Sequence, residues 1–296
     1  MPLIHYYEKA EIIRNKKDNF NLDIIIPTYN NEQGLITTLK SIQNCPEITI
    51  NIIDDASTVS YREKILASFP YVNWISLNKN SGPGVAREVG ILNTTNPYLM
   101  FIDTGDYLYS KDSLNRILND IKTNSLPDIY LYQWYNEENK HFSTDWNPLM
   151  HGHIYRREFL ELYNINFCEE SSYSNEDVGF NHICDMILNH IQTYDLTEHK
   201  VYYEYPIYFY TYDPNSITHA GGKEYYYTKQ IAGLAYNAKH VIKNAEKNNI
   251  NIYVLLNELN VLFVGLYESF LLCAKRRPDL LYDNWPYIRK FYFETY

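Results

Sequence analysis

The sequence has 296 residues, enough for one large hydrophobic core or two smaller ones. Its 45% hydrophobic and 21% charged residues are typical of a folded, soluble protein. The formal net charge of -10 argues against a broad nucleic-acid-binding surface, because such a surface needs clustered Lys and Arg to meet the phosphates.

Short apolar runs alternate with helical patterns in the first part of the chain. The runs predict strands at 22–26, 48–53, 72–77 and 98–102, and the helical spacing predicts helices at 32–42, 61–69 and 83–92. We expect Pro27 to stop the first strand, while Pro83 suits the first turn of a helix. Strands that alternate with helices predict a doubly wound parallel sheet with right-handed crossovers.

The second part of the chain predicts a mixture of strands and helices. Strands are expected at 129–134, 152–155 and 201–212, and helices at 111–121, 157–163, 175–187, 225–244 and 252–274, with a short element around 285–293. Asn175 suits the N-cap of its helix. We place one domain at 1–221, divided at about residue 110, and a helical region at 222–296.

The cysteines, the N-terminus and one apolar segment bear on where the protein is found in the cell. The four cysteines lie far apart without metal-ligand spacing, which fits free thiols in a reducing compartment, and the N-terminus lacks the pattern of a signal peptide. We therefore expect a cytoplasmic protein. The apolar segment 261–274 is too short to span a bilayer and is interpreted as a packing helix. The basic residues 275–277 that follow it leave peripheral membrane contact as an alternative.

Polar segments follow each of the first four predicted strands. They are Pro27-Thr28-Tyr29-Asn30, Asp54-Asp55-Ala56-Ser57, the segment 78–87 with Arg87, and Asp103-Thr104-Gly105-Asp106. Parallel strands end at one edge of a sheet, so these segments are predicted to converge on one ligand. Glycine-rich phosphate motifs are absent from the sequence, so a nucleotide would be held by carboxylates, hydroxyls and backbone groups.

These motifs, in this order, resemble the family 2 glycosyltransferases. The resemblance is carried by the segments 24–30, 53–57, 86–91, 101–106, 149–157 and 174–181, and covers roughly residues 22–220. It implies an α/β fold of the GT-A type: a Rossmann-like, mostly parallel sheet flanked by helices, here with a C-terminal helical appendage. It also implies transfer of a sugar, with inversion, from a nucleotide-sugar, most often a UDP-sugar. The nucleotide-binding half would be about 20–110 and the acceptor half about 111–221.

The resemblance implies roles for residues at the strand ends. Asp55 would accept a hydrogen bond from the base, with Asp54 supporting the turn, and Arg87 would balance phosphate or form an ion pair with Asp103 or Asp54. The other donor-binding residues would be Pro27, Thr28, Tyr29, Asn30, Asp103, Thr104 and Gly105.

Asp177 matches the position of the family's catalytic base, and Glu176 is the alternative base or a residue that binds the acceptor. Inverting transfer needs a carboxylate that removes the proton of the attacking hydroxyl. Without the other motifs, two acids at this place would simply complement a helix dipole.

The sequence departs from the family at Gly105, where many relatives have an acid that contacts a divalent metal, Mn or Mg. Either Asp103 or Asp106 takes over, or the dependence on metal is weakened. His219 is a candidate remote ligand. His151 and His153 would line the acceptor side or contact phosphate.

The sequence therefore predicts a glycosyltransferase of the hexosyltransferase type that acts on a hydroxyl of a glycan, a teichoic-acid-like polymer or a protein. One alternative, motivated by Gly105, is a module that binds a nucleotide-sugar with little or no catalysis. Another is a glycosyltransferase that acts on modified DNA bases, against which the net charge weighs.

Overall fold

The computed structural model describes residues 20–124, 127–143, 148–172, 174–195, 198–214, 216, 223–276, 278–280 and 289. The chain divides into two compact units, the first made of residues 1–164 and 197–212 and the second of residues 165–196 and 213–296. The second unit thus takes in residues 165–196, which we had expected to belong to the first domain. The expected boundary at 221–222 and most of the expected terminal element at 285–293 lie outside the described residues.

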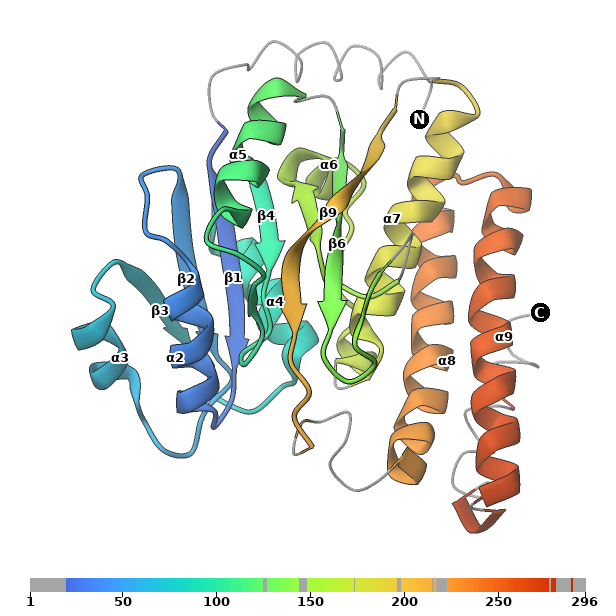
Figure 1. The fold of residues 1–296 in the computed structure, drawn as a ribbon. Helices are drawn as coiled ribbons and strands as arrows, with labels where there is room; N and C mark the ends of the chain where they lie inside the picture. The colour runs from blue at the N-terminus through green and yellow to red at the C-terminus, as the bar shows by residue number, and fades with distance from the viewer. Residues whose placement is uncertain are drawn as a thin grey trace. The chain divides into compact units, whose positions relative to one another are not determined.

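The first unit is built on a nine-stranded sheet. Its strands are β1 (Leu22–Thr28), β2 (Ile48–Asp54), β3 (Val72–Ser76), β4 (Tyr98–Phe101), β5 (Tyr107–Leu108), β6 (Ile129–Asn136), β7 (His141–Phe142), β8 (His153–Arg156) and β9 (Lys200–Tyr210). The order is β3-β2-β1-β4-β8-β6-β9-β5, with β7 on β6. β1 to β4 pair in parallel, and β8 is antiparallel to β4, so the predicted mostly parallel sheet is present (Figure 1).

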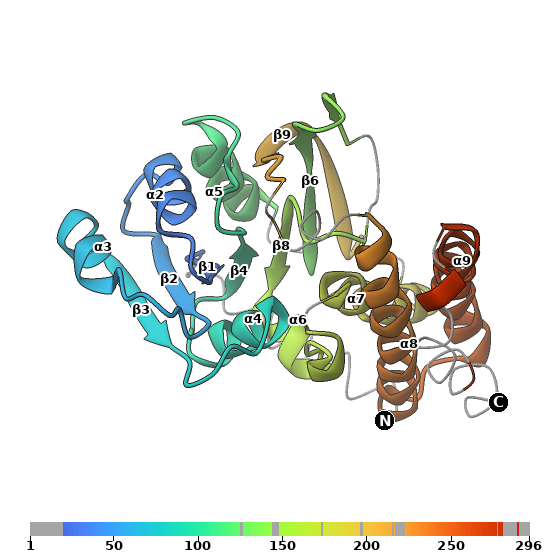
Figure 2. The same cartoon turned by 90° about the horizontal axis from the view of Figure 1, so that it is seen from below.

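Helices cover both faces of this sheet, as Figure 2 shows. α2 (Glu32–Ser41) and α5 (Ser113–Thr123) lie on one face, and α4 (Pro83–Leu92) and α6 (Arg157–Leu162) lie on the other, while α3 (Arg62–Ser68) connects β2 to β3. Because water is excluded from both faces, the central strands carry continuous apolar runs, and all seven residues of β1 are buried.

β1 continues through Pro27, so the prediction that Pro27 stops the strand is wrong. Pro27 pairs with Ile53 of β2, whereas β4 pairs with β1 only as far as Ile25. The Pro27 carbonyl points to the side of β4 and accepts from Thr104. The Pro27 nitrogen, which carries no hydrogen, is on the same side of β1. The pairing with β4 has already ended there, so the proline removes no hydrogen bond between the two strands.

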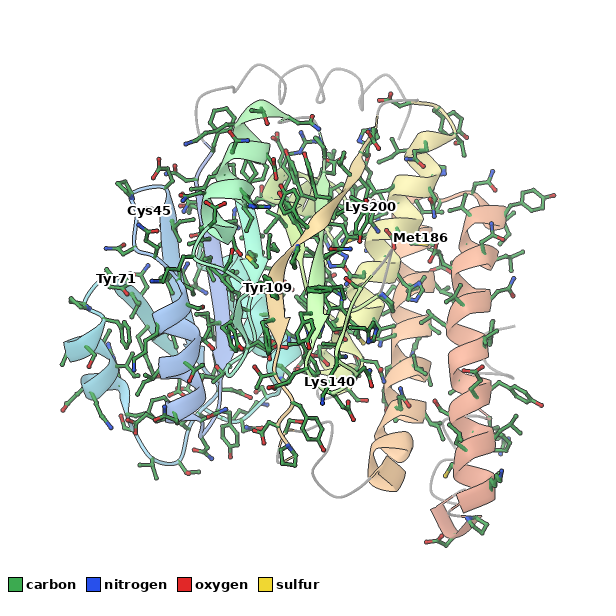
Figure 3. The ribbon with its side chains drawn as sticks, viewed as in Figure 1. Cys45, Tyr71, Tyr109, Lys140, Met186 and Lys200 are labelled. Carbon is green, nitrogen blue, oxygen red and sulfur yellow. The ribbon has the colours of Figure 1, made fainter. Side chains whose placement is uncertain are left out.

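Aromatic side chains account for part of the surface around β5, β7 and β9. Tyr107 stacks on Phe209 with ring centroids 4.4 Å apart. Tyr109, labelled in Figure 3, contacts Phe142 with centroids 5.6 Å apart. The two short strands β5 and β7 were missed from the sequence, because two residues are too few to show alternation.

The second unit contains helices α7 (Glu176–Gln192), α8 (Lys223–Asn248) and α9 (Ile252–Arg276), which lie side by side, with 3-10 turns at Glu169–Ser171 and Pro278–Leu280 (Figure 1). His182 on α7 meets Glu258 on α9, with Nδ1 2.8 Å from Oε2, and the Asn189 side chain donates to the other carboxylate oxygen at 3.1 Å. These buried polar contacts fix α7 against α9.

α9 has one buried and one exposed apolar face. Leu259, Leu262 and Leu266 are buried, which agrees with the expected packing helix. Val264 and Tyr267 are 57% and 55% exposed. Among the described residues, Ile252–Lys275 is the one helical segment long and apolar enough to cross a membrane by length and composition, and 28% of its most apolar window is buried. Peripheral membrane contact stays a prediction.

We expect Gly152→Ala to lower the free energy of unfolding by about 1–3 kcal/mol, because the new side chain would be strained. Gly152 has φ 75, and a Cβ there would lie 2.5 Å from the Tyr132 carbonyl oxygen. Gly265→Ala is the control, since its Cβ would meet Leu234 at an ordinary 3.6 Å and a helical alanine adds up to about 1 kcal/mol. Urea denaturation followed by circular dichroism measures the free energy of unfolding of both variants. A Gly152→Ala variant as stable as the wild type would contradict the predicted strain.

Candidate active site

The polar segments after β1, β2 and β4 meet at one edge of the sheet, as the sequence predicts. The Asp55 amide donates to the Thr28 carbonyl at 2.9 Å. On the other side of β1, the Thr104 hydroxyl donates to the Pro27 carbonyl at 2.7 Å. The three segments are therefore hydrogen-bonded to one another, and Pro27, Thr28, Asp55 and Thr104 lie together at this edge.

The segment after β1 presents one exposed aromatic ring. Thr28 is buried, and its hydroxyl lies 3.0 Å from the Tyr61 hydroxyl. Asn30 has φ 49, and its side-chain oxygen accepts from the Thr58 amide at 2.8 Å. Tyr29, between them, is 43% exposed. Tyr29 is thus the residue of this segment that is free to stack on a ligand ring.

The Asp54 and Asp55 carboxylates organise the loops around them. Asp54 Oδ1 accepts from the Ser57 amide at 3.0 Å. Asp55 accepts from the amides of Ser81 and Gly82 at 2.7 and 2.8 Å, one on each oxygen. Burial raises the pKa of Asp55. Asp55 therefore anchors the loop that leads into α4, and its contact with a base, through the lone pairs that remain, stays a prediction.

Arg87 forms an ion pair with Asp103. Its Nη2 lies 2.5 Å from Asp103 Oδ1, and its side chain is 3% exposed whereas that of Asp103 is 40% exposed. Of the two partners considered from the sequence, Asp103 rather than Asp54 is the one that the structure provides. A buried guanidinium thus neutralises one acid of the segment 103–106 and leaves that acid accessible.

Asp106 is buried and held by β9 and the residue that follows it. The Tyr208 hydroxyl donates to Asp106 Oδ2 at 2.6 Å, and the Thr211 amide donates to Oδ1 at 2.9 Å. The same Tyr208 oxygen accepts from the Asp103 amide at 3.2 Å. Burial raises the pKa of Asp106 well above its usual range, and the Asp103 carboxylate adds to the rise. A nearby cation would therefore stabilise the ionised form of Asp106.

His151 joins these two acids. Ligand atoms of Asp103, Asp106 and His151 all lie within 4.8 Å of one another, and His151 Nε2 is 3.9 Å from Asp106 Oδ2. His151 Nδ1 is buried and has no hydrogen-bond partner. Burial lowers the pKa of His151 to about 4, so the ring is neutral at pH 7. Two carboxylates and a neutral imidazole are a donor set that fits a divalent cation.

Two predicted groups of residues remain, the ligand His219 and the pair Glu176 and Asp177. His219 is outside the described residues. Glu176 and Asp177 occupy the first turn of α7 in the second unit, where Asp177 Oδ1 accepts from the Val178 amide at 2.8 Å. Asn175 is the N-cap residue of α7, as predicted, with φ 56, although its side chain makes no cap hydrogen bond. The catalytic roles of Glu176 and Asp177 stay predictions.

Sequence reasoning missed Tyr208, Thr211 and Thr38. The Thr38 hydroxyl donates to the Asp106 carbonyl at 2.7 Å and accepts from the Gly105 amide at 3.0 Å. No sequence signal marks these residues. Tyr208 is one of 31 tyrosines and lies 102 positions from the acid that it contacts.

Comparison with known proteins decides the family. The model of glycosyl transferase family 2 matches residues 23–177, more than half of the chain. The chain belongs to glycosyl transferase family 2. The match begins in β1 and ends at Asp177, so it includes both the polar edge of the sheet and the Glu176-Asp177 pair.

An uncharacterized glycosyltransferase of Rickettsia conorii is 31% identical over 174 residues, which is 53% of this chain and 28% of that protein. The chain spans less than half of the length of this and two other curated glycosyltransferases that it matches.

Two solved structures have a similar fold. Staphylococcus aureus TarS 1–349 in complex with UDP superposes with a TM-score of 0.59 and 21% identity, over 82% of this chain and 72% of that one. The mannosyltransferase PcManGT from Pyrobaculum calidifontis, in complex with GDP-Man and Mn2+, superposes with a TM-score of 0.52 and 13% identity. The match covers 98% of this chain and 88% of that one. These matches confirm the GT-A fold predicted from the sequence.

Proposed function

We propose that this family 2 protein is an inverting glycosyltransferase that transfers a sugar from a UDP-sugar to an acceptor hydroxyl. The observation that carries the proposal is the meeting of the segments after β1, β2 and β4 at one sheet edge, with Asp103 and Asp106 beside the buried Arg87. The open edge of an α/β sheet at the carboxyl ends of its strands is where ligands of such sheets bind.

The donor would occupy this edge. Tyr29 is exposed for stacking on the base, and the carboxylate of Asp55 suits an imide N–H. The Arg87–Asp103 pair would lie toward the ribose or the diphosphate. The UDP in the TarS structure, a protein of the same fold, supports the choice of uridine.

A divalent cation, Mn2+ or Mg2+, would assist the reaction, and Asp103, Asp106 and His151 would hold it. When bound, such an ion stabilises the negative charge that develops on the leaving diphosphate. The Mn2+ in the PcManGT structure supports this cofactor. The protein would contribute metal-binding side chains that other residues already hold in position, Asp106 by Tyr208 and Thr211 and Asp103 by Arg87.

Asp177 would act as the general base for the acceptor hydroxyl, which would belong to a glycan, a polymer or a protein. The support is its place at the end of the family match, in the Glu176-Asp177 pair. As the hydroxyl oxygen attacks the anomeric carbon, its proton passes to the carboxylate and the bond to the diphosphate breaks, so that the configuration is inverted.

A panel of UDP-sugars tests the proposal. We expect UDP release above the rate without protein for at least one donor when Mn2+ is present, and no salt-sensitive binding of DNA, because the net charge is -10. Calorimetry run in parallel identifies the alternative. UDP binding without any turnover would favour a binding module over an enzyme.

A further inference from the structure

We propose that His151 is a metal ligand of this protein and replaces the carboxylate that Gly105 does not provide. This inference rests on the proposed use of a nucleotide-sugar, because the cation would be bound together with the diphosphate. It concerns a residue of the loop before β8, 46 positions along the chain from Gly105.

Gly105 is unsuited to carry a ligand of its own. It has φ 108, a backbone conformation that residues with a Cβ rarely adopt. A carboxylate restored at this position would therefore be strained, although the space around it is open, with Asn31 Nδ2 4.0 Å from the expected Cβ. A third donor from the protein would therefore come from another segment of the chain.

His151 supplies that donor from the loop before β8. Its ring lies between three aromatic side chains, with centroid distances of 4.8 Å to Trp134, 5.0 Å to Tyr208 and 4.9 Å to Tyr210. These contacts fix the plane of the imidazole and leave its buried Nδ1 without a hydrogen-bond partner. Nε2 lies 3.9 Å from Asp106 Oδ2, close enough for one cation to bind both atoms after a small adjustment.

The Asp103 and Asp106 carboxylates are also oriented to bind a cation. Tyr208 and Thr211 each donate to one oxygen of Asp106, and each oxygen keeps a second lone pair for a metal. Hydrogen bonds of this kind to the ligands of a metal orient them and raise affinity. Asp103 Oδ1 is taken by Arg87, and its Oδ2 accepts no hydrogen bond from the described residues. The site therefore presents Asp103 Oδ2, Asp106 Oδ2 and His151 Nε2.

A nitrogen ligand has a measurable consequence. Mg2+ prefers oxygen ligands, whereas an imidazole favours transition metals. The protein with UDP is therefore expected to bind Mn2+ more tightly than Mg2+, and this preference should depend on His151. A histidine that only packed between aromatic rings, or that contacted phosphate directly, would not set the preference.

The test is a titration of the UDP-bound protein with Mn2+, followed by electron paramagnetic resonance, with Mg2+ measured by competition. We expect His151→Ala to weaken Mn2+ binding by about 100-fold or more and to reduce the preference for Mn2+ over Mg2+. His141→Ala is the matched control, because His141 is exposed on β7, outside the cluster, and should bind Mn2+ as the wild type does.

His151→Cys guards against a variant that is merely misfolded. A thiolate prefers soft ions, so this variant should lose Mn2+ affinity and gain Cd2+ affinity relative to the wild type, with a new sulfur-to-metal charge-transfer band. Thermal melting and UDP binding in EDTA verify that each variant is folded. An intact fold that shows no Cd2+ gain would count against direct ligation.

The inference is overturned if folded His151→Ala binds Mn2+ within about threefold of the wild type, a loss smaller than that of even an outer-shell residue. It is equally overturned if His151→Ala weakens UDP binding in EDTA and leaves Mn2+ affinity unchanged, which would make His151 a phosphate-binding residue. UDP-sugar turnover with normal Mn2+ binding by His151→Ala would refute this inference alone. Mn2+ binding that depends on His151, without turnover of any UDP-sugar, would refute the proposed function alone.

Discussion

Asp177→Asn is expected to reduce the rate of sugar transfer by about 10²- to 10⁴-fold, because an amide cannot take the proton of the acceptor hydroxyl. The substitution keeps the shape of the side chain and, through its carbonyl oxygen, the bond from the Val178 amide, at 2.8 Å in the wild type. UDP binding should therefore stay near the wild-type value. The measurement is single-turnover UDP release with the best donor, together with calorimetry of UDP binding.

Glu176→Gln is the comparison, since Glu176 is the neighbouring acid and the alternative base. If Asp177 is the base, Glu176→Gln should retain most of the chemical rate, and any loss should appear in the apparent affinity for the acceptor. If Glu176→Gln loses the rate and Asp177→Asn keeps it, the roles are reversed and the prediction for Asp177 is wrong.

Arg157→Met is expected to lower the free energy of unfolding of the first unit by about 3–5 kcal/mol, because it leaves a buried charge without its partner. Arg157 lies at the start of α6, and its guanidinium donates to the Asp23 carboxylate at 3.2 Å and to the Thr94 hydroxyl at 2.6 Å. Asp23 is 2% exposed on β1. Methionine fills much of the volume but pairs with none of these groups.

Arg116→Met is the matched control, because Arg116 pairs with Asp112 at 3.0 Å while both side chains are at least half exposed. An exposed pair of this kind is worth less than about 1 kcal/mol. Guanidinium denaturation measures both variants. Equal effects of the two substitutions would show that the Arg157–Asp23 pair has little role in stability.

The central sheet could be predicted from local sequence because its strands are buried on both faces. A continuous apolar run such as that of β4 is nearly unambiguous when helical patterns lie on either side. The helix at Pro83–Leu92 was predicted to the residue, because Pro83 marks its first turn. The prediction that Pro27 stops β1 failed because it depended on which neighbouring strand had already ended. That cannot be read from residue type.

The sequence by itself determined the family, the GT-A fold and the strand-end acids, because each is written in short contiguous motifs such as Asp103-Thr104-Gly105-Asp106. Only the tertiary structure decided which groups complete the site. The bonds from Tyr208 and Thr211 to Asp106, and the approach of His151 to the same acid, join residues separated by 45 to 105 positions. Such contacts depend on the pairing of β9 with β5 and β6 and of β8 with β4, which no local pattern specifies.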